Sequence, residues 1–309
     1  MVAVVIILTL ILVTSSPADE HPTTFDQQTQ WVMGTTLHIF LPNDLNDRDE
    51  IFSTCFATAH HWDGLLSPWK PEAPMTRLSR LAGTWVPVPP ELLDYLERAA
   101  HDADRSGHVF DITLTHEGSR HLAIDRDHGR ARIPARSHAL DPGADGKGVA
   151  LDAIATNLDA LGVTSYFLDF GGSSFLARGH GPTTAGWHVA LTGPSGQVLG
   201  TIQLVDTALS VSSSVQRRHL EDGTVEERFH LIDLRTGDSV SARRTAAVLS
   251  PSATEAEVLS TVAAILGHGV SGRFPACALG VFGDRSDDGQ VQIEFARFFT
   301  AAKNDEGAN

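Results

Sequence analysis

The sequence contains little cysteine, with only Cys55 and Cys277 among 309 residues. No Cys-x-x-Cys pair and no paired-histidine spacing indicates a zinc site. Cys55 falls on the apolar stripe of an expected helix, and Cys277 stands in the apolar stretch 274–279. We therefore expect two buried free thiols, and one long-range disulfide in an oxidising compartment remains the alternative.

Positive charge is also scarce. The chain has 23 Lys and Arg against 38 Asp and Glu, a net charge of −15, and the acidic residues are spread along the sequence. This balance argues against nucleic acid or an anionic membrane surface as the main partner. A polyanionic ligand would need local glycine amides, a lysine or a metal ion to hold it.

No Lys or Arg precedes the apolar run of residues 1–14, and no cysteine follows it at the small residues Ser16-Pro17-Ala18. The run is short for a membrane span. Residues 1–18 therefore resemble a secretory signal peptide, with an uncleaved N-terminal anchor as the alternative, and not a lipoprotein signal. We expect an exported protein, in the periplasm or at the outer face of the cytoplasmic membrane, with one domain over 19–303 and a disordered tail over 304–309.

Helical and strand patterns alternate irregularly along the domain. Apolar spacing and end signals predict helices over 47–66, from Pro90 to Gly107, over 149–161 and from Ser252 to Gly267. Alternation predicts strands over 31–40, after a polar linker, and over 187–191, while the charged segment 119–139 is expected to be a surface excursion. Such irregular alternation favours an α+β fold over a strict βαβ series.

The stretch from Asp141 to Gly148 combines three glycines with Lys147 directly before a predicted helix. Glycines let the backbone approach a ligand closely, and the free N–H groups of a helix start attract anions. Lys147 would add a point charge suited to a phosphate. On the residues of this segment alone, an ordinary loop–helix–strand connection with glycine at its caps is the favoured interpretation.

This stretch resembles the signature of the ApbE family, the FAD:protein FMN transferases. That signature joins a Gly- and Lys-containing loop, an Asp on the next helix and a Gly-Gly turn after the following strand. The matching positions here are Asp141, Gly143, Lys147, Gly148, Asp152, Gly171 and Gly172. The resemblance implies that Asp141 and Lys147 contact FAD, and that Lys147 also serves catalysis by orienting phosphates.

Further motifs follow in the order that the family has. Met33-Gly34-Thr35 resembles its opening tripeptide, and Trp69 stands where an aromatic side chain contacts FAD. The segment 108–113 resembles the motif that binds the nucleotide end of FAD, which implies Val109, Phe110 and Asp111 as binding residues. A solvated aspartate at a strand start is the alternative for Asp111.

The segment 230–237, His-Leu-Ile-Asp-Leu-Arg-Thr-Gly, is the most specific match to the family. By resemblance, His230 would be the proton acceptor and Ile232 would contact FAD. A structural histidine is the alternative. Nearby positions depart from the family pattern, with Ser214 for Gly, Gln216 for Tyr and Leu234 for Pro.

Glu257 and Thr261, four residues apart, share one face of the last predicted helix. The family places an Asp and a Thr here, which hold magnesium together with a loop carbonyl. The resemblance therefore implies a Mg²⁺ site made of Ala144, Glu257 and Thr261. The glutamate is a departure, because it moves the carboxylate by roughly one bond length in a site that demands tight octahedral geometry.

By resemblance, the fold is ApbE-like α+β, with mixed and antiparallel sheets flanked by helices in two closely joined subdomains. The implied reaction is metal-dependent transfer of FMN from FAD to a Ser or Thr hydroxyl of an exported acceptor protein, with release of AMP. The family suggests a respiratory redox subunit as acceptor, and an uncleaved anchor would imply inner-membrane association. The alternatives are hydrolysis of FAD to FMN and AMP, and a periplasmic FAD-binding protein without catalysis.

Overall fold

The structure is a computed structural model, and it describes residues 23–135, 139–182, 186–219, 224–267, 278–285 and 291–297. The predicted signal or anchor segment 1–18, the tail 304–309 and Cys277 lie outside the described residues. Within the described part of the chain, no helix is both long and apolar enough to cross a membrane.

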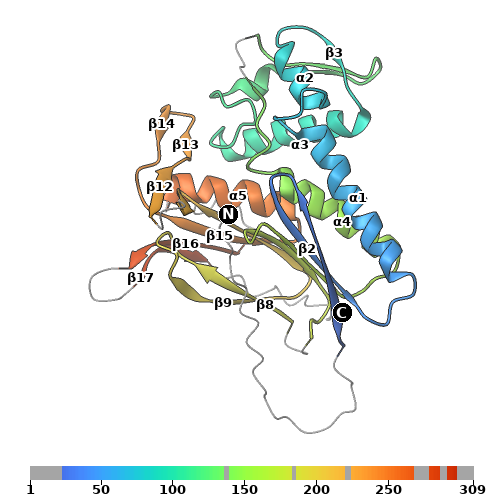
Figure 1. Cartoon of the computed structure of the whole chain (residues 1–309). Helices are drawn as coiled ribbons and strands as arrows, with labels where there is room; N and C mark the ends of the chain where they lie inside the picture. Colours follow the sequence, from blue (N-terminus) through green and yellow to red (C-terminus); the bar gives the residue numbers. More distant parts are fainter. Residues whose placement is uncertain are drawn as a thin grey trace, which may run out of the picture.

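An antiparallel sheet of eight strands organises the larger subdomain (Figure 1). Its order is β1-β2-β6-β7-β10-β15-β16-β17, so β2 pairs with β6, β7 with β10 and β10 with β15 although these strands are distant in the sequence. The strands are β1 (Phe25–Val32), β2 (Thr35–Pro42), β6 (Tyr166–Phe170), β7 (Ser174–Arg178), β10 (Thr207–Ser213), β15 (Thr245–Ser250), β16 (Ala278–Arg285) and β17 (Val291–Arg297).

Helices α1 (Arg48–Leu66), α4 (Gly146–Ala160) and α5 (Ala253–Leu266) lie on one side of this sheet (Figure 1). Buried side chains of α1 and α4 pack with those of β2, β6 and β7 in one core cluster. Helix α5 is apolar around most of its circumference. Leu259 packs with the strand residues Ala246 and Val248, whereas Val262 packs in the core of a second, smaller subdomain. Such a helix is stable only between two layers.

The opposite face of the sheet is covered by the hairpin of β8 (Trp187–Thr192) and β9 (Val198–Leu204). Alternate residues of β8 are buried, as its sequence alternation predicts. Trp187 stacks on Phe167 with the ring centroids 5.0 Å apart. The middle of the large sheet is therefore buried on both faces.

A smaller subdomain contains α2 (Pro74–Arg80), α3 (Pro90–Ser106), the short helix η1 (Gly118–His121) and a three-stranded sheet. That sheet has the order β3 (Val86–Pro87), β5 (Arg130–Arg132), β4 (Ala123–Asp125). The expectation of a surface excursion over 119–139 is wrong in part, because Ala131 and Ile133 are fully buried in this core. Met33 and Trp62 pack against the cores of both subdomains and join them.

Two hairpins, β11 (Val215–His219) with β12 (Val225–Phe229) and β13 (Ile232–Asp233) with β14 (Asp238–Ser239), follow β10. They form the orange projection beside α5 in Figure 1.

The predicted helices are confirmed, with α4 starting three residues before Val149, so that Lys147 lies in its first turn. Gly107 ends α3 in a left-handed conformation. Cys55 is a buried free thiol, and burial raises its pKa to about 12.

The predicted strand over 31–40 is confirmed for residues 31–32 and 35–40 but is wrong in running through residues 33–34, and the predicted polar linker is wrong for residues 25–30, which belong to a strand. Residues 25–32 form β1, and the chain reverses at Met33-Gly34 before β2. Both turn residues have positive φ, 50° at Met33 and 77° at Gly34, as two-residue hairpin turns require. The alternating pattern continued through the turn, so periodicity alone did not reveal it.

Candidate functional site

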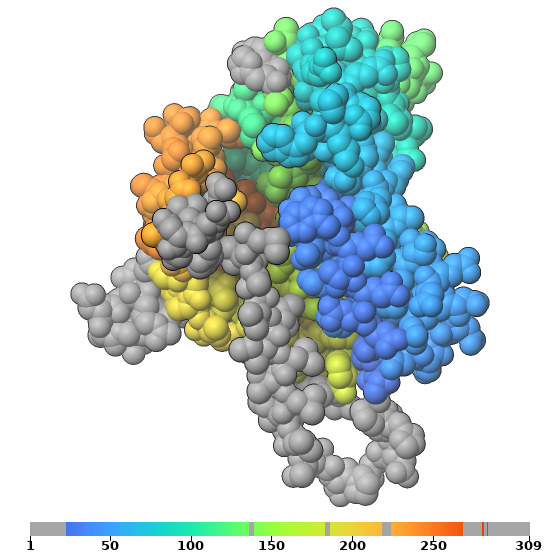
Figure 2. Space-filling model, viewed as in Figure 1, coloured from blue at the N-terminus to red at the C-terminus, as the bar shows by residue number. Residues whose placement is uncertain are grey.

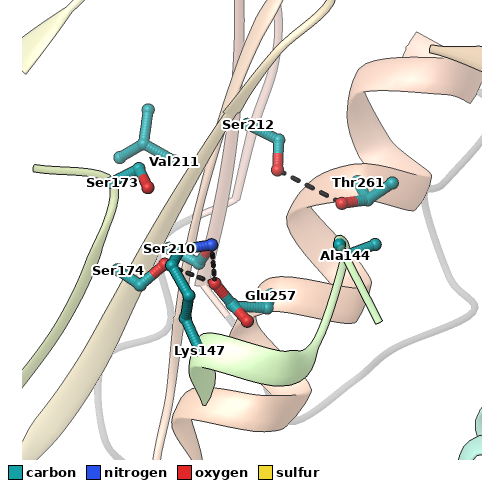
Figure 3. Close-up of a pocket in the computed structure, with 10 residues that line it drawn as sticks. Ala144, Lys147, Ser173, Ser174, Ser210, Val211, Ser212, Glu257 and Thr261 are labelled. Atoms are coloured by element: carbon teal, nitrogen blue, oxygen red, sulfur yellow. Dashed lines mark hydrogen bonds and ion pairs between the residues drawn. The ribbon is translucent and has the colours of Figure 1, made fainter. Parts of the chain in front are cut away.

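A small pocket lies where α4 begins, between α5 and the strands β7 and β10 (Figure 3). Its volume of about 40 Å³ has room for an ion with water but not for a flavin ring system. The predicted residues Ala144, Lys147, Glu257 and Thr261 all line it. The other lining residues are Gly143, Ser173, Ser174, Ser210, Val211 and Ser212.

Glu257 supplies the negative charge of the pocket from α5, and its carboxylate is buried. One oxygen, Oε1, is 2.6 Å from the ammonium nitrogen of Lys147 and accepts a short hydrogen bond from Ser174. The other oxygen accepts from the Gly148 backbone N–H at 2.7 Å. The structure thus brings together the predicted phosphate-orienting lysine and the predicted metal-binding acid.

Serine side chains of β10 also line the pocket. Ser210 and Ser212 share one face of β10, and both contact Ser260, at 2.9 and 2.7 Å between hydroxyl oxygens. Ser212 also contacts Thr261 at 3.3 Å. The predictions did not include these serines, although their alternate spacing in the sequence places them on one side of a strand.

Close packing of α4 on α5 aligns the two halves of the pocket. A Cβ atom at Gly148 would lie 2.6 Å from the Ala253 carbonyl oxygen, so only glycine fits. Asp152 accepts hydrogen bonds at the start of α5 from Ser252 Oγ at 2.7 Å and from the N–H groups of Ala253 and Thr254 at 2.8 and 3.0 Å. Asp152, which the family pattern contains, therefore positions the helix that carries Glu257 and Thr261.

A buried cluster of ionisable side chains lies at the start of α4, next to the pocket residues. Asp145 is fully buried, accepts a hydrogen bond from the Tyr95 hydroxyl at 2.9 Å and pairs with Arg98 at 3.2 Å. Burial raises the pKa of Asp145 to about 7, although the charge of Arg98 opposes the shift. The contact ties the start of α4 to α3. The sequence motif included Asp145 but did not reveal its partners.

Met33 and Asp141 flank the start of α4. A Cβ atom at Gly146 would lie 3.3 Å from the methyl group of Met33, which places this side chain directly against the first turn of α4. The Asp141 carboxylate accepts from the Gly143 N–H at 2.8 Å, and the Asp141 N–H donates to the Ile112 carbonyl at 2.8 Å. The predicted loops around residues 111 and 141 are therefore neighbours.

The predicted nucleotide-binding motif at 109–111 is mostly internal. Val109 and Phe110 pack in the core of the smaller subdomain. The buried Asp111 carboxylate accepts hydrogen bonds from the backbone and hydroxyl groups of Thr113 and Ser119. These contacts hold the loop 111–119 in shape, so any ligand contact of Val109 and Phe110 would come from their backbone.

Trp69, the predicted aromatic contact, is 88% exposed on the connection between α1 and α2. The Ser67 hydroxyl accepts hydrogen bonds from the Trp69 and Lys70 N–H groups and fixes the local backbone. The indole is free to stack on a planar ring.

His230 lies on the segment that leads into hairpin β13–β14, and Ile232 is the first residue of β13. The His230 N–H donates to the Ser214 carbonyl at 3.4 Å, just beyond the end of β10. The His230 side chain lies at the surface, but its surroundings desolvate the imidazole and lower its pKa, and no described residue forms a hydrogen bond with the ring. Ile232 is 48% exposed. Figure 2 shows a hollow between the orange surface of these hairpins and the blue surface of β1–β2.

The predicted divalent cation would need oxygen ligands in this pocket. Ala144, Glu257 and Thr261 offer hard oxygen donors on one pocket. Glu257 is the only acid among the described residues that line it, and no cluster of three or more His, Cys, Asp or Glu occurs in the described part of the chain. Mg²⁺ usually takes one or two carboxylates together with water and substrate phosphates. The donor set therefore fits a cation that a phosphate group helps to hold.

The fold and the pocket define an α+β protein with a small polar pocket at the start of α4. The fold matches that of known flavin transferases. The ApbE protein of Thermotoga maritima has a TM-score of 0.74 at 18% identity over 87% of this chain and 97% of that one. The flavin transferase ApbE of Vibrio cholerae has a TM-score of 0.73 at 19% identity, over 89% of this chain and 97% of that one. The flavinyl transferase ApbE of Pseudomonas stutzeri has a TM-score of 0.74 at 21% identity, over 89% of this chain and 96% of that one.

The family assignment comes from the sequence itself. The chain matches the ApbE family over residues 33–119 and 114–274, which is well over half of its length. The chain belongs to the ApbE family. No curated protein matches the chain at the level of sequence.

Proposed function

We propose that this protein transfers FMN from FAD to a Ser or Thr hydroxyl of an acceptor protein and releases AMP. The observation that carries the proposal is the convergence of Ala144, Lys147, Glu257 and Thr261 on one pocket, within a fold shared with flavin transferases. In the reaction, the hydroxyl oxygen bonds to the FMN phosphorus, and the bond from that phosphorus to the AMP phosphate breaks.

The chain's own residues have separate roles in this proposal. Lys147 and the first turn of α4 orient the pyrophosphate, because an ammonium and a helix start both attract phosphate oxygens. His230 accepts the proton of the acceptor hydroxyl, since its lowered pKa keeps the imidazole neutral near pH 7. The space for the two ends of FAD is bordered by Met33, Trp69, Asp141 and Ile232, and by the loop of Val109, Phe110 and Asp111.

A divalent cation would be held by Ala144, Glu257 and Thr261. When bound, it supplies charge neutralisation of the pyrophosphate and helps AMP to leave. We place the reaction outside the cytoplasm on the strength of the signal-like residues 1–18. The mass of the protein recovered from the periplasm tests this placement, because removal of residues 1–18 is the expected result.

The experiment is incubation of the purified protein with FAD, Mg²⁺ and a threonine-containing acceptor, with AMP and acceptor mass as readouts. The expected result is AMP together with an acceptor that has gained FMN less one water. AMP with free FMN and an unmodified acceptor would instead support hydrolysis of FAD. Binding of FAD without any AMP would support a non-catalytic flavin-binding protein.

A further inference from the structure

The pocket contains one acid and one base, and they are already paired with each other. Among the described residues that line it, Glu257 is the only carboxylate and Lys147 the only cation. Their charged atoms are 2.6 Å apart, with the Glu257 side chain 3% exposed and the Lys147 side chain 23% exposed. Such a pair is poorly screened by solvent, so its charges interact strongly.

Most of the acceptor positions of the Glu257 carboxylate are already occupied by hydrogen-bond donors. A carboxylate offers about four lone-pair positions. The Lys147 ammonium, the Ser174 hydroxyl and the Gly148 N–H use three of them. Figure 3 shows the carboxylate directed towards Lys147 and Ser174, whereas Ala144 and Thr261 lie together on the other side of the pocket.

A divalent cation that joined Glu257 to Ala144 and Thr261 would meet the Lys147 ammonium at the same carboxylate. Two cations at contact distance in a buried site repel each other strongly. They therefore exclude each other at Glu257. Once displaced, the Lys147 ammonium would need another anion, which the pyrophosphate of the substrate supplies.

We infer that Lys147 is an internal cation that competes with the divalent metal for Glu257. In the metal-free protein it neutralises the buried carboxylate, and metal binding transfers it to the phosphate of the ligand. This inference rests on the proposed function for the identity of that ligand, but the competition itself involves only the protein and the metal. It makes metal affinity weak until a phosphate is present.

The chain offers a matched control for this inference. It has three lysines, Lys70, Lys147 and Lys303. Lys70 pairs with Asp63 at the same separation of 2.6 Å, but on the connection after α1, and it is absent from the pocket lining. A substitution at Lys70 thus removes an equivalent ion pair without touching Glu257.

The first test is Mg²⁺ titration of the full chain by calorimetry, without FAD or acceptor. Lys147→Gln should bind Mg²⁺ at least tenfold more tightly than the parent protein, and Lys70→Gln should bind it with unchanged affinity. If Lys147→Gln bound Mg²⁺ with equal or weaker affinity than the parent protein, the inferred competition would be overturned. The same would follow if neither the parent protein nor Lys147→Gln bound Mg²⁺.

The second test needs no variant, so it is independent of any folding defect. Amine acetylation of the native protein is followed at Lys147 and Lys70 by peptide mass spectrometry. Mg²⁺ should accelerate acetylation of Lys147 several-fold and leave Lys70 unchanged, and an unaltered Lys147 rate sinks the inference. A protein that passes both tests yet forms no FMN-modified acceptor would refute the proposed transfer and leave the competition standing.

Discussion

His230 is the residue whose chemistry depends most on its local environment. Its backbone N–H donates to Ser214, just beyond the end of β10, and desolvation lowers the pKa of its imidazole. A histidine whose pKa is lowered loses its proton at a lower pH, so the neutral form that can accept a proton persists into mildly acidic solution. We expect kcat/KM for FMN transfer to rise with pH through a midpoint below about 6.5 and then to level off.

The matching variant is His230→Ala, which should lower kcat/KM by roughly 100-fold or more and abolish that rise. His188→Ala is the control, because His188 is an exposed histidine on β8, a strand that covers the opposite face of the sheet. A pH profile that is identical in the parent protein and in His230→Ala would show that another group takes the proton.

At the scale of elements, the contact between α4 and α5 decides whether the pocket exists. Gly148 allows the helices to touch, and Asp152 accepts three hydrogen bonds at the start of α5. Because the Gly148 N–H also donates to Glu257, any separation of these helices would disturb both the fold and the site.

Replacing Asp152 by Ala should lower the free energy of unfolding by about 2–4 kcal/mol, since it leaves two N–H groups and a hydroxyl without their charged acceptor. Urea denaturation measures this change. Asp49→Ala is the control, because Asp49 is an exposed aspartate in the first turn of α1 and should change stability by no more than about 0.5 kcal/mol. A similarly small change for Asp152→Ala would mean that Ser252 alone is sufficient to cap α5.

At the scale of the whole molecule, the two subdomains share their core. Trp62 and Met33 pack against both clusters, and α5 contributes side chains to the smaller subdomain as well as to the face of the sheet. Cores that share elements in this way should unfold together.

We therefore expect a single calorimetric unfolding transition. Trp62→Ala should shift it as a whole and destabilise the protein by about 2 kcal/mol or more, because a large side chain is lost from a junction between cores. Trp31→Ala, at a position that is 60% exposed, provides the comparison and should have little effect. Two resolved transitions in the parent protein would contradict a shared core.

The sequence by itself determined the local elements and the family. Apolar spacing and end signals identified α1, α3 and α5, down to Gly107 at the end of α3 and the start of α5 at Ser252, because these signals act within a few residues. The order of the motifs was sufficient to identify the ApbE family, and the irregular alternation of helices and strands was sufficient for an α+β fold.

Only the tertiary structure decided which charges meet. The Lys147–Glu257 pair and the Asp145–Tyr95–Arg98 cluster join residues far apart in sequence, and no local pattern encodes such contacts. Asp111 appeared to be available for a ligand but is used within its own loop. The turn at Met33-Gly34 was hidden because strand alternation continues through it, and only pairing of β1 with β2 reverses the chain there.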